Sequence, residues 1–483
     1  MKTIGNVQKD GQVRAVASGA LTDGKAVIVN ANGTVSVVAG SDTAYGSEVA
    51  WDEPSGGNIT YNISAFDSNS NKVVIAYKNG DDSGHGYCIV GTVSGNSITF
   101  GSAVEFANEI VQPWGGMSFD SNSNKIVISY AGGNYAYGKS IVGTVSGNSI
   151  SFGTPVVWYS GNANFVSSCF DSTANKIIIS YQDAGSSDYG KAIVGTVSGT
   201  SISFGSAATF RSGATKAPWC DHDPDNNKTL IVFKNLGNND IECVVATVSG
   251  TSISFGSTVT IEQDYNSHDP TTIYDPTNDK FIVAYGDAGD TKGTVLVGTV
   301  SGTSISFGSK TTFLSNYAEY IRLVHDPDQN KIIISYADGG NSNNLETKIG
   351  TVSGTSISVE DPISLLGSYG YYIAMAYDTL NDKTVVTYTK DRTGSTDSGN
   401  SKVLTIGSTN LTSENFVGFS DGAFADTQSA VINTANTIDR NQTSLTAGQT
   451  YFVSTSGALS TTAGDPSVTA GTAISSTELI VKG

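Results

Sequence analysis

Aromatic residues are concentrated in the segments that differ between the internal repeats of this sequence, and most lie near Asn, Asp or Gly. This combination suits carbohydrate, because a flat ring covers the C–H face of a sugar while polar groups bind its hydroxyls. Each ring also has a structural interpretation, since Trp and Tyr often pack in gaps between elements. The candidate ligand-binding residues are Trp114, Tyr135, Tyr137, Tyr159, Trp219, Tyr265, Tyr317, Tyr320, Tyr369, Tyr371 and Tyr372.

Histidine and acidic residues recur in patterns that favour structural roles. His222 and His325 belong to a periodic set that directly precedes a repeated Asp, which predicts packing between repeats. The run Asp221-x-Asp223-x-Asp225 resembles a calcium loop but lacks the Gly and Glu of an EF-hand, so calcium is a minor alternative. We predict no metal site and no cofactor. The periodic set is Phe66, Phe119, Phe170, His222, Tyr274, His325 and Tyr377.

Catalytic motifs are absent from the sequence. There is no Gly-x-Ser-x-Gly, His-Glu-x-x-His or P-loop pattern, and no Ser-x-Asp-x-Gly-x-x-Trp box of a sialidase. A glycosidase with two carboxylates is an open alternative, because acids are plentiful in the loops. So many repeated acids indicate no particular pair, and we predict a non-enzymatic protein. The acids in comparable loops are Asp82, Asp183, Asp287, Asp338 and Asp391.

A repeat of about fifty residues positions these candidates. The hexapeptide Asp-x-x-x-[Asn/Asp]-Lys occurs seven times, and successive copies start 53, 51, 52, 52, 51 and 52 residues apart. The copies start at Asp67, Asp120, Asp171, Asp223, Asp275, Asp326 and Asp378. A second string, Gly-Thr-Val-Ser-Gly-[Asn/Thr]-Ser-Ile-[Ser/Thr]-Phe-Gly or a close variant, accompanies most of them. So regular a period is typical of a repeat architecture.

Each repeat is predicted to contain four antiparallel strands. In the second repeat, residues 125–130 are β-branched and apolar, as an inner strand buried on both faces should be. Residues 140–145 have the same character, and residues 146–149 form a tight hairpin turn before an alternating outer strand. Four strands per repeat predict the blades of a β-propeller. The predicted fold class is all-β, a seven-bladed propeller.

The ring is predicted to close through a strand from the start of the chain. The seventh repeat lacks a clear outer strand, whereas residues 44–51 resemble residues 99–106. We therefore expect residues 43–52 to supply the outer strand of blade seven, which removes open strand edges.

The two ends of the chain are predicted to form a small β module. Residues 21–40 align without gaps to residues 445–464, with eight of twenty positions identical, and each segment predicts a hairpin with a turn at Gly33 or Gly457. The predicted organisation is an N-terminal β module over 1–42, the propeller over 43–410 and a C-terminal β module over 411–483. A low-complexity linker is the alternative for 411–440.

Loop variability locates the predicted recognition face. The Asp-x-x-x-Asn-Lys and Ser-Gly-x-Ser turns stay short and nearly uniform, whereas the loops between second and third strands and between blades vary. In a four-stranded blade these two variable sets emerge on the same face. Variable loops on a rigid ring are typical of recognition.

The string Ile-Val-Gly-Thr-Val-Ser-Gly-Thr-Ser-Ile-Ser-Phe-Gly-Ser resembles the propeller repeats of tail-fibre and other virion proteins of bacteriophages. The segments 415–421, 442–453, 457–462, 470–474 and 479–483 resemble a small module at the C-terminus of such proteins. The resemblance covers nearly the whole chain and implies a virion protein exposed to the host. It implies as partners a host surface polysaccharide or receptor and other virion proteins, but it names no chemistry.

Composition restricts the remaining classes. The formal net charge of −18 argues against nucleic-acid and membrane-surface binding. No apolar run approaches membrane-spanning length, and the first ten residues do not predict a secretory signal. Cys88, Cys169, Cys220 and Cys243 show no metal-ligand spacing, so we expect free, mostly buried thiols.

We therefore expect a phage tail or fibre protein that binds a host glycan through its variable-loop face. The terminal module would anchor it to the particle or mediate self-association. The alternatives are a structural or capsid-decorating virion protein and a polysaccharide depolymerase.

Overall fold

A computed structural model describes residues 11–41, 43–52, 59–112, 115–263, 270–287, 292–391, 397–464 and 466–482. Every regular element of these residues is a β-strand, so the predicted all-β class is confirmed. None of them forms a helix that could span a membrane. The chain divides into two compact units, residues 45–405 and residues 1–44 with 406–483.

The larger unit is built from antiparallel sheets that follow the sequence repeat. The first contains β6 (Ile59–Asp67), β7 (Lys72–Asn79), β8 (His85–Ser94), β9 (Ser97–Phe100) and β10 (Val104–Ala107). The next contains β11 (Gly116–Asp120), β12 (Lys125–Gly132), β13 (Tyr137–Ser146), β14 (Ser149–Phe152) and β15 (Val156–Tyr159). In both, two short strands, such as β9 and β10, share the outer edge of the third strand.

Two long strands each join a pair of repeats into a nine-stranded sheet. One such sheet holds β16 (Ala163–Asp171), β17 (Lys176–Asp183), β18 (Tyr189–Ser198), β19 (Ser201–Phe204), β20 (Ala208–Asp223), β21 (Lys228–Asn235), β22 (Ile241–Ser249), β23 (Ser252–Phe255) and β24 (Val259–Glu262). A five-stranded sheet follows, with β25 (Thr271–Asp275), β26 (Lys280–Asp287), β27 (Lys292–Ser301), β28 (Ser304–Phe307) and β29 (Thr311–Leu314). The other nine-stranded sheet holds β30 (Ala318–Asp326), β31 (Lys331–Asp338), β32 (Asn344–Ser353), β33 (Ser356–Val359), β34 (Ile363–Asp378), β35 (Lys383–Lys390), β36 (Ser398–Thr405), β4 (Ala44–Tyr45) and β5 (Val49–Asp52).

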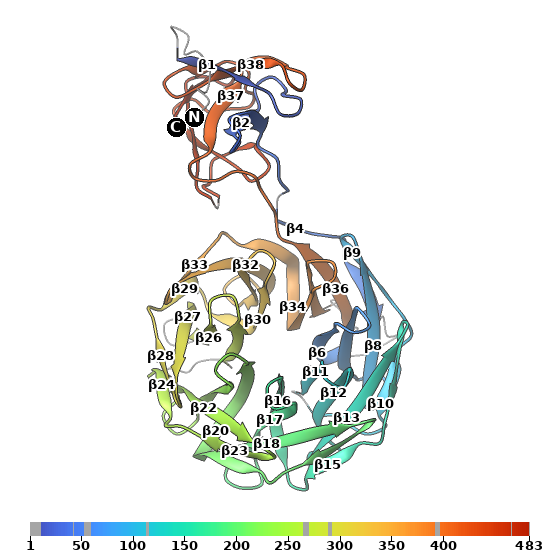
Figure 1. The fold of residues 1–483 in the computed structure, drawn as a ribbon. Helices are drawn as coiled ribbons and strands as arrows, with labels where there is room; N and C mark the ends of the chain where they lie inside the picture. The colour runs from blue at the N-terminus through green and yellow to red at the C-terminus, as the bar shows by residue number, and fades with distance from the viewer. Residues whose placement is uncertain are drawn as a thin grey trace. The chain divides into compact units, whose positions relative to one another are not determined.

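These sheets lie in a ring, a β-propeller-like arrangement. Figure 1 shows β6, β11, β16 and β30 toward the centre of the ring and β9, β15, β24, β28 and β33 at its periphery. Hydrophobic clusters fill the spaces between adjacent sheets, and one of them joins the first repeat to the last through Trp51, Ile75 and Val385. The predicted pairing of residues 43–52 with the last repeat is present, because β5 pairs with β36 in antiparallel register.

The repeated Asp closes a turn in all seven repeats. In the second repeat, the Asp120 carboxylate accepts hydrogen bonds from the backbone N–H groups of Asn122 and Ser123, both at 3.0 Å. Equivalent bonds occur at the other six aspartates. The repeated Asp therefore closes an Asx-type turn.

The smaller unit contains two sheets with the same strand order. The first contains β1 (Gln12–Val16), β38 (Ser429–Asn433), β37 (Phe416–Ser420), β2 (Ala26–Val29) and β3 (Val35–Val37) in that order. The second contains β39 (Ile438–Asp439), β43 (Leu479–Val481), β42 (Thr469–Ala473), β40 (Thr450–Val453) and β41 (Leu459–Ser460). Each sheet thus runs first, fifth, fourth, second, third.

The two sheets also share their irregularities. A bulge interrupts the β2–β37 pairing after Val27, and the β40–β42 pairing after Tyr451, which is the aligned position. A glycine lies opposite each, and a Cβ there would approach a backbone oxygen at 1.9 Å for Gly418 and 2.1 Å for Gly471. The smaller unit therefore contains two copies of one motif, of which copy one is residues 12–38 with 416–433 and copy two is residues 438–481.

Candidate functional site

Five innermost strands of the larger unit carry a bulge near the same point. The pairing register shifts between Thr60 and Ile63 in β6, and at equivalent places in β16, β20, β30 and β34. Bulky residues with positive φ are genuine outliers, and retained backbone strain is a pointer to function. One residue in each bulge has a φ of 48° to 55°, namely Tyr61, Phe165, Ala217, Tyr320 and Tyr372.

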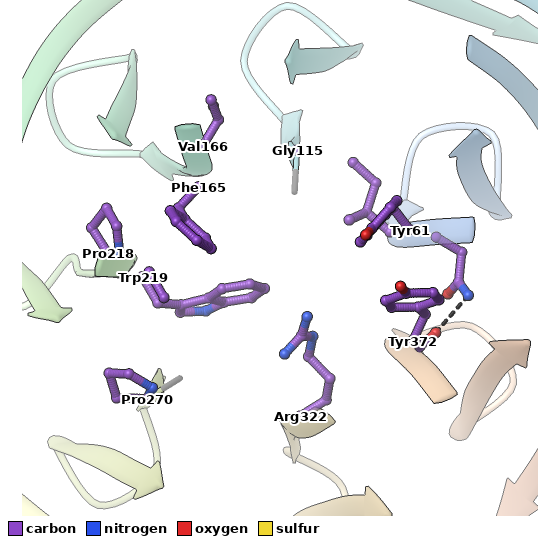
Figure 2. A pocket seen from close by; sticks show the side chains of 12 residues that line it. Tyr61, Gly115, Phe165, Val166, Pro218, Trp219, Pro270, Arg322 and Tyr372 are labelled. Atoms are coloured by element: carbon purple, nitrogen blue, oxygen red, sulfur yellow. Dashed lines mark hydrogen bonds between the residues drawn. The ribbon is translucent and has the colours of Figure 1, made fainter. Parts of the chain in front are cut away.

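The bulges surround a pocket at the centre of the ring, which we call the axial pocket. Figure 2 shows Tyr61 and Tyr372 side by side, with Trp219, Phe165 and Arg322 reaching in from other strands. The centroids of Tyr61 and Tyr372 are 4.4 Å apart, and the Arg322 guanidinium lies 4.5 Å from the Trp219 ring centroid. Its lining is Tyr61, Asn62, Ile63, Gly115, Phe165, Val166, Ala217, Pro218, Trp219, Pro270, Arg322 and Tyr372.

A buried amide holds one side of the axial pocket in place. The Asn62 side chain is 3% exposed, and its Nδ2 donates to the Tyr372 backbone oxygen at 2.5 Å. Its Oδ1 accepts from the Thr387 hydroxyl at 2.8 Å. Because Asn62 lies in the first repeat and Thr387 in the last, these bonds fix the Tyr372 bulge relative to the Tyr61 bulge. Burial chiefly raises the pKa of the Tyr372 phenol, which therefore stays neutral at ordinary pH.

The structure brings five of the predicted residues to this region. Trp219 and Tyr372 line the axial pocket, and Tyr320 contacts Tyr372 with centroids 5.2 Å apart. Tyr371 continues the aromatic contacts, 4.8 Å from Tyr372, and its hydroxyl donates to Asp397. Tyr369 is 44% exposed and contacts Tyr371 at 5.8 Å, so it extends the same surface.

The other predicted aromatics lie elsewhere. Tyr135 and Tyr137 line a separate hollow, described below. Tyr159 contacts Trp158 and Tyr181 and donates to Asp183, and burial raises its pKa to about 12, so packing accounts for it. Tyr317 packs against Gly339. Trp114 and Tyr265 lie outside the described residues.

Of the twelve residues that line the axial pocket only Trp219 and Tyr372 were predicted, and the large side chains that were missed are Tyr61, Phe165 and Arg322. Tyr61 and Phe165 stand six positions before a repeated Asp, a position at which Trp114, Tyr320 and Tyr372 also stand. Arg322 stands four positions before its repeated Asp, as Trp219 does in its own repeat. Aligning the repeats at these two positions, six and four residues before the repeated Asp, would have indicated Tyr61, Phe165 and Arg322.

The loop acids serve local structure where the structure describes their side chains. Asp82 accepts from the Tyr87 hydroxyl at 2.6 Å, and Asp183 pairs with Lys191 at 2.6 Å. Asp338 accepts from the Gly340 N–H at 2.9 Å. The Asp391 backbone N–H donates to the Tyr369 oxygen, and the Asp287 side chain lies outside the described part.

Only part of the candidate calcium run converges, because Asp223 and Asp225 lie close to each other and to Asp279, whereas Asp221 does not join them. Asp221 is half-buried and accepts from the backbone N–H groups of His222 and Tyr274. Burial raises its pKa to about 6. Asp225 accepts from the Tyr274 hydroxyl at 2.7 Å, while both carboxylate oxygens of Asp223 accept from Asn226. Protein donors thus bind these acids.

The histidines and cysteines have the predicted surroundings. Nε2 of His222 lies 3.2 Å from an oxygen of Asp171, the repeated Asp of the preceding repeat, and His325 contacts Asp275 in the same way. Burial lowers the pKa of both imidazoles, so they stay neutral and pack between repeats. All four cysteines are buried and free, as predicted.

Comparison with known proteins adds information on the fold only. No protein-family model matches the sequence, and no curated protein matches it. A structure from Lactobacillus plantarum has a TM-score of 0.44 at 10% identity, covering 73% of this chain and 95% of that one. AofleA from Arthrobotrys oligospora has a TM-score of 0.43 at 10% identity, covering 74% and 100%. The Trypanosoma rangeli sialidase has a TM-score of 0.43 at 10% identity, covering 82% of this chain and 60% of the sialidase. At these scores the likenesses support no inference about function.

Proposed function

We propose that residues 45–405 form a closed seven-bladed propeller, with the other unit as a terminal β module. The seven Asp turns support this count, and β20 and β34 each account for a fused pair of repeats. A repeated contact supports closure. Gly101 lies against the Asn148 backbone oxygen of the following repeat, and Gly46, ahead of the first repeat, lies against the Asn96 oxygen in the same way.

We propose that this propeller binds a carbohydrate in the axial pocket. The observation that carries the proposal is the set of four aromatic residues held at positive φ around one mouth, since such strain persists only where the surrounding structure enforces it. Trp219 and the aromatic side chains offer plates for sugar rings, and Arg322 and the backbone offer polar contacts. The pocket lies at the start of the innermost strands, on the side of the variable loops.

The biological setting is proposed from the sequence resemblance. In that setting the chain is a tail or fibre protein of a bacteriophage, non-enzymatic, and its ligand is a glycan on the host surface. The terminal module anchors it to the particle or mediates self-association. Immunogold labelling of intact particles with an antibody against residues 45–405 tests the location, and absence of label from the particle surface contradicts it.

A glycan array with the full chain tests binding, and the Trp219→Ala variant tests the site. We expect Trp219→Ala to weaken binding at least tenfold, because one stacking plate is lost. Leu380→Ala is the matched control, since Leu380 is 60% exposed in an Asp turn at the far end of an innermost strand. Equal binding by wild type and Trp219→Ala, or no binding to any arrayed glycan, contradicts the proposal.

A further inference from the structure

A second hollow, which we call the Tyr135 groove, lies between the second and third repeats. It forms where the loop between β12 and β13 meets the loop between β15 and β16. None of the described residues that line it is charged, although the chain carries a net charge of −18. The lining is Gln112, Asn134, Tyr135, Ala136, Tyr137, Ser160, Gly161, Asn162 and Asn164.

Two tyrosines form a plate in this groove. The rings of Tyr135 and Tyr137 are stacked, with centroids 5.7 Å apart and planes at 21°. Tyr135 is 74% exposed, whereas most aromatic side chains of the larger unit are buried or half-buried. Stacking on Tyr137 already restricts the exposed Tyr135 side chain, so little side-chain entropy is lost when a ligand binds. The ring is therefore a preformed surface for the apolar face of a ligand.

Four amides surround the plate. Among the described residues, the side chains of Gln112, Asn134, Asn162 and Asn164 have no hydrogen-bond partner. Elsewhere in the unit, loop asparagines are used structurally, and Asn238 for example donates to Asp240 at 2.7 Å. Amides offer both donors and acceptors, which is what vicinal hydroxyl groups require.

The groove and the axial pocket lie next to each other along β16. Asn164 lines the groove and the next residue, Phe165, lines the axial pocket. A narrow intervening hollow contains Gln112 of the groove together with Tyr61 and Gly115 of the axial pocket. Because Asn164 and Phe165 are neighbours in β16, a linear ligand seated at the axis has a short path to the groove.

We propose that the Tyr135 groove is a second sugar subsite, and that the ligand is a polysaccharide chain whose segment over the groove is uncharged. This inference rests on the proposed carbohydrate binding at the axial pocket. Stacking on Tyr135 and Tyr137 holds a pyranose face, and the four amides bind its hydroxyls. Affinity then depends on the number of linked sugars, because only a chain occupies both subsites.

The test measures binding against chain length by isothermal titration calorimetry. The probes are linear oligosaccharides of glucose, of mannose and of N-acetylglucosamine, each with one to six units. We expect at least one series to bind at least tenfold more tightly at four to six units than at one. The variant with both Tyr135→Ala and Tyr137→Ala should lose this gain and keep the affinity for the single unit.

The control is Tyr189→Ala, since Tyr189 begins β18 as Tyr137 begins β13 but lies outside the groove. It should keep the dependence on chain length. Equal affinity for one and six units, binding of none of the three series, or an unchanged gain in the double variant would each overturn the subsite. Binding of arrayed glycans that is lost in Trp219→Ala would still support the axial pocket, so the two failures are distinguishable.

Discussion

At the scale of single residues, the aromatic side chains of the axial pocket combine strain with partial exposure. Each non-glycine residue at positive φ costs about 1–3 kcal/mol. Sequence reasoning found Trp219, Tyr320 and Tyr372 but not Tyr61, Phe165 or Arg322. Aromatic residues at the same position of successive repeats are compatible with packing and with ligand binding. Only the positive φ angle distinguishes the two roles. That angle depends on a bulge that no residue type in these strands reveals.

Ala217 permits a direct test of this strain. It has a φ of 48° in β20, and Gly adopts that angle without a steric cost. We expect Ala217→Gly to stabilise the chain by about 1 kcal/mol. Ala208→Gly in the same strand is the control and should destabilise it by about 0.5–1 kcal/mol. Urea denaturation measures both, and loss of stability in Ala217→Gly contradicts the account.

Buried histidines predict a pH dependence of stability. Burial lowers the pKa of His222 and His325 from 6.5, so the folded state binds fewer protons than the unfolded state. Their contribution to stability is therefore full above pH 6.5 and decreases as the pH falls below it. The aligned residue in three other repeats is Phe, so the double variant His222→Phe and His325→Phe suits the site.

We expect the double variant to lose less stability than wild type between pH 7.5 and 5, as measured by thermal denaturation. The raised pKa of Asp221 has the opposite effect on stability as the pH falls, but it is present in both proteins. The difference between their pH dependences therefore reports on the histidines. Parallel curves for the two proteins would contradict a titration of these imidazoles.

At the scale of elements, closure depends on a strand that is remote in sequence. A Cβ on Gly399 of β36 would lie 2.3 Å from the Trp51 ring of β5, and one on Gly86 would lie 2.4 Å from the Phe106 ring. The same aromatic-on-glycine contact thus occurs within the first repeat and between the two ends of the larger unit. The sequence predicted β5 because residues 44–51 retain the pattern of an outer strand. This pattern includes the aromatic residue that packs on a glycine.

Trp51→Ala tests the closing strand. Removing the ring should destabilise the larger unit by about 3–5 kcal/mol. It should also speed hydrogen exchange at the amides of β5, because this packing helps to hold the strand against β36. Phe106→Ala is the control, since it should lower stability without affecting exchange in β5. Unchanged exchange in Trp51→Ala would contradict the role assigned to this strand.

At the scale of the whole molecule, the larger unit is an insertion within copy one of the duplicated motif. Copy two passes directly from Leu459–Ser460 to Thr469–Ala473, whereas copy one passes from β3 to β37 through residues 38–415. The segments that leave and return are paired, with a bridge between Gly40 and Thr409. The sequence revealed the hairpin shared by both copies, but not the fourth and fifth strands, because Phe416–Ser420 and Thr469–Ala473 share only a glycine.

Replacing residues 41–408 by the connection of copy two should leave a folded smaller unit. We expect cooperative thermal unfolding and dispersed NMR resonances, because each strand keeps its partners within the unit. The full chain is the reference for the chemical shifts of copy two. Absence of cooperative unfolding would contradict an insertion into a self-sufficient motif.

This interleaving imposes an order on biosynthesis. Chains are made from the N-terminus, and domains fold as their residues emerge from the ribosome. Strands β1 to β3 emerge first, yet their partners β37 and β38 follow only after the entire ring has been translated. Strand β5 likewise waits for β36. A nascent chain that stops inside the ring therefore lacks the β5–β36 pair and the last two strands of copy one. Copy one can assemble only in chains that have been translated through β38.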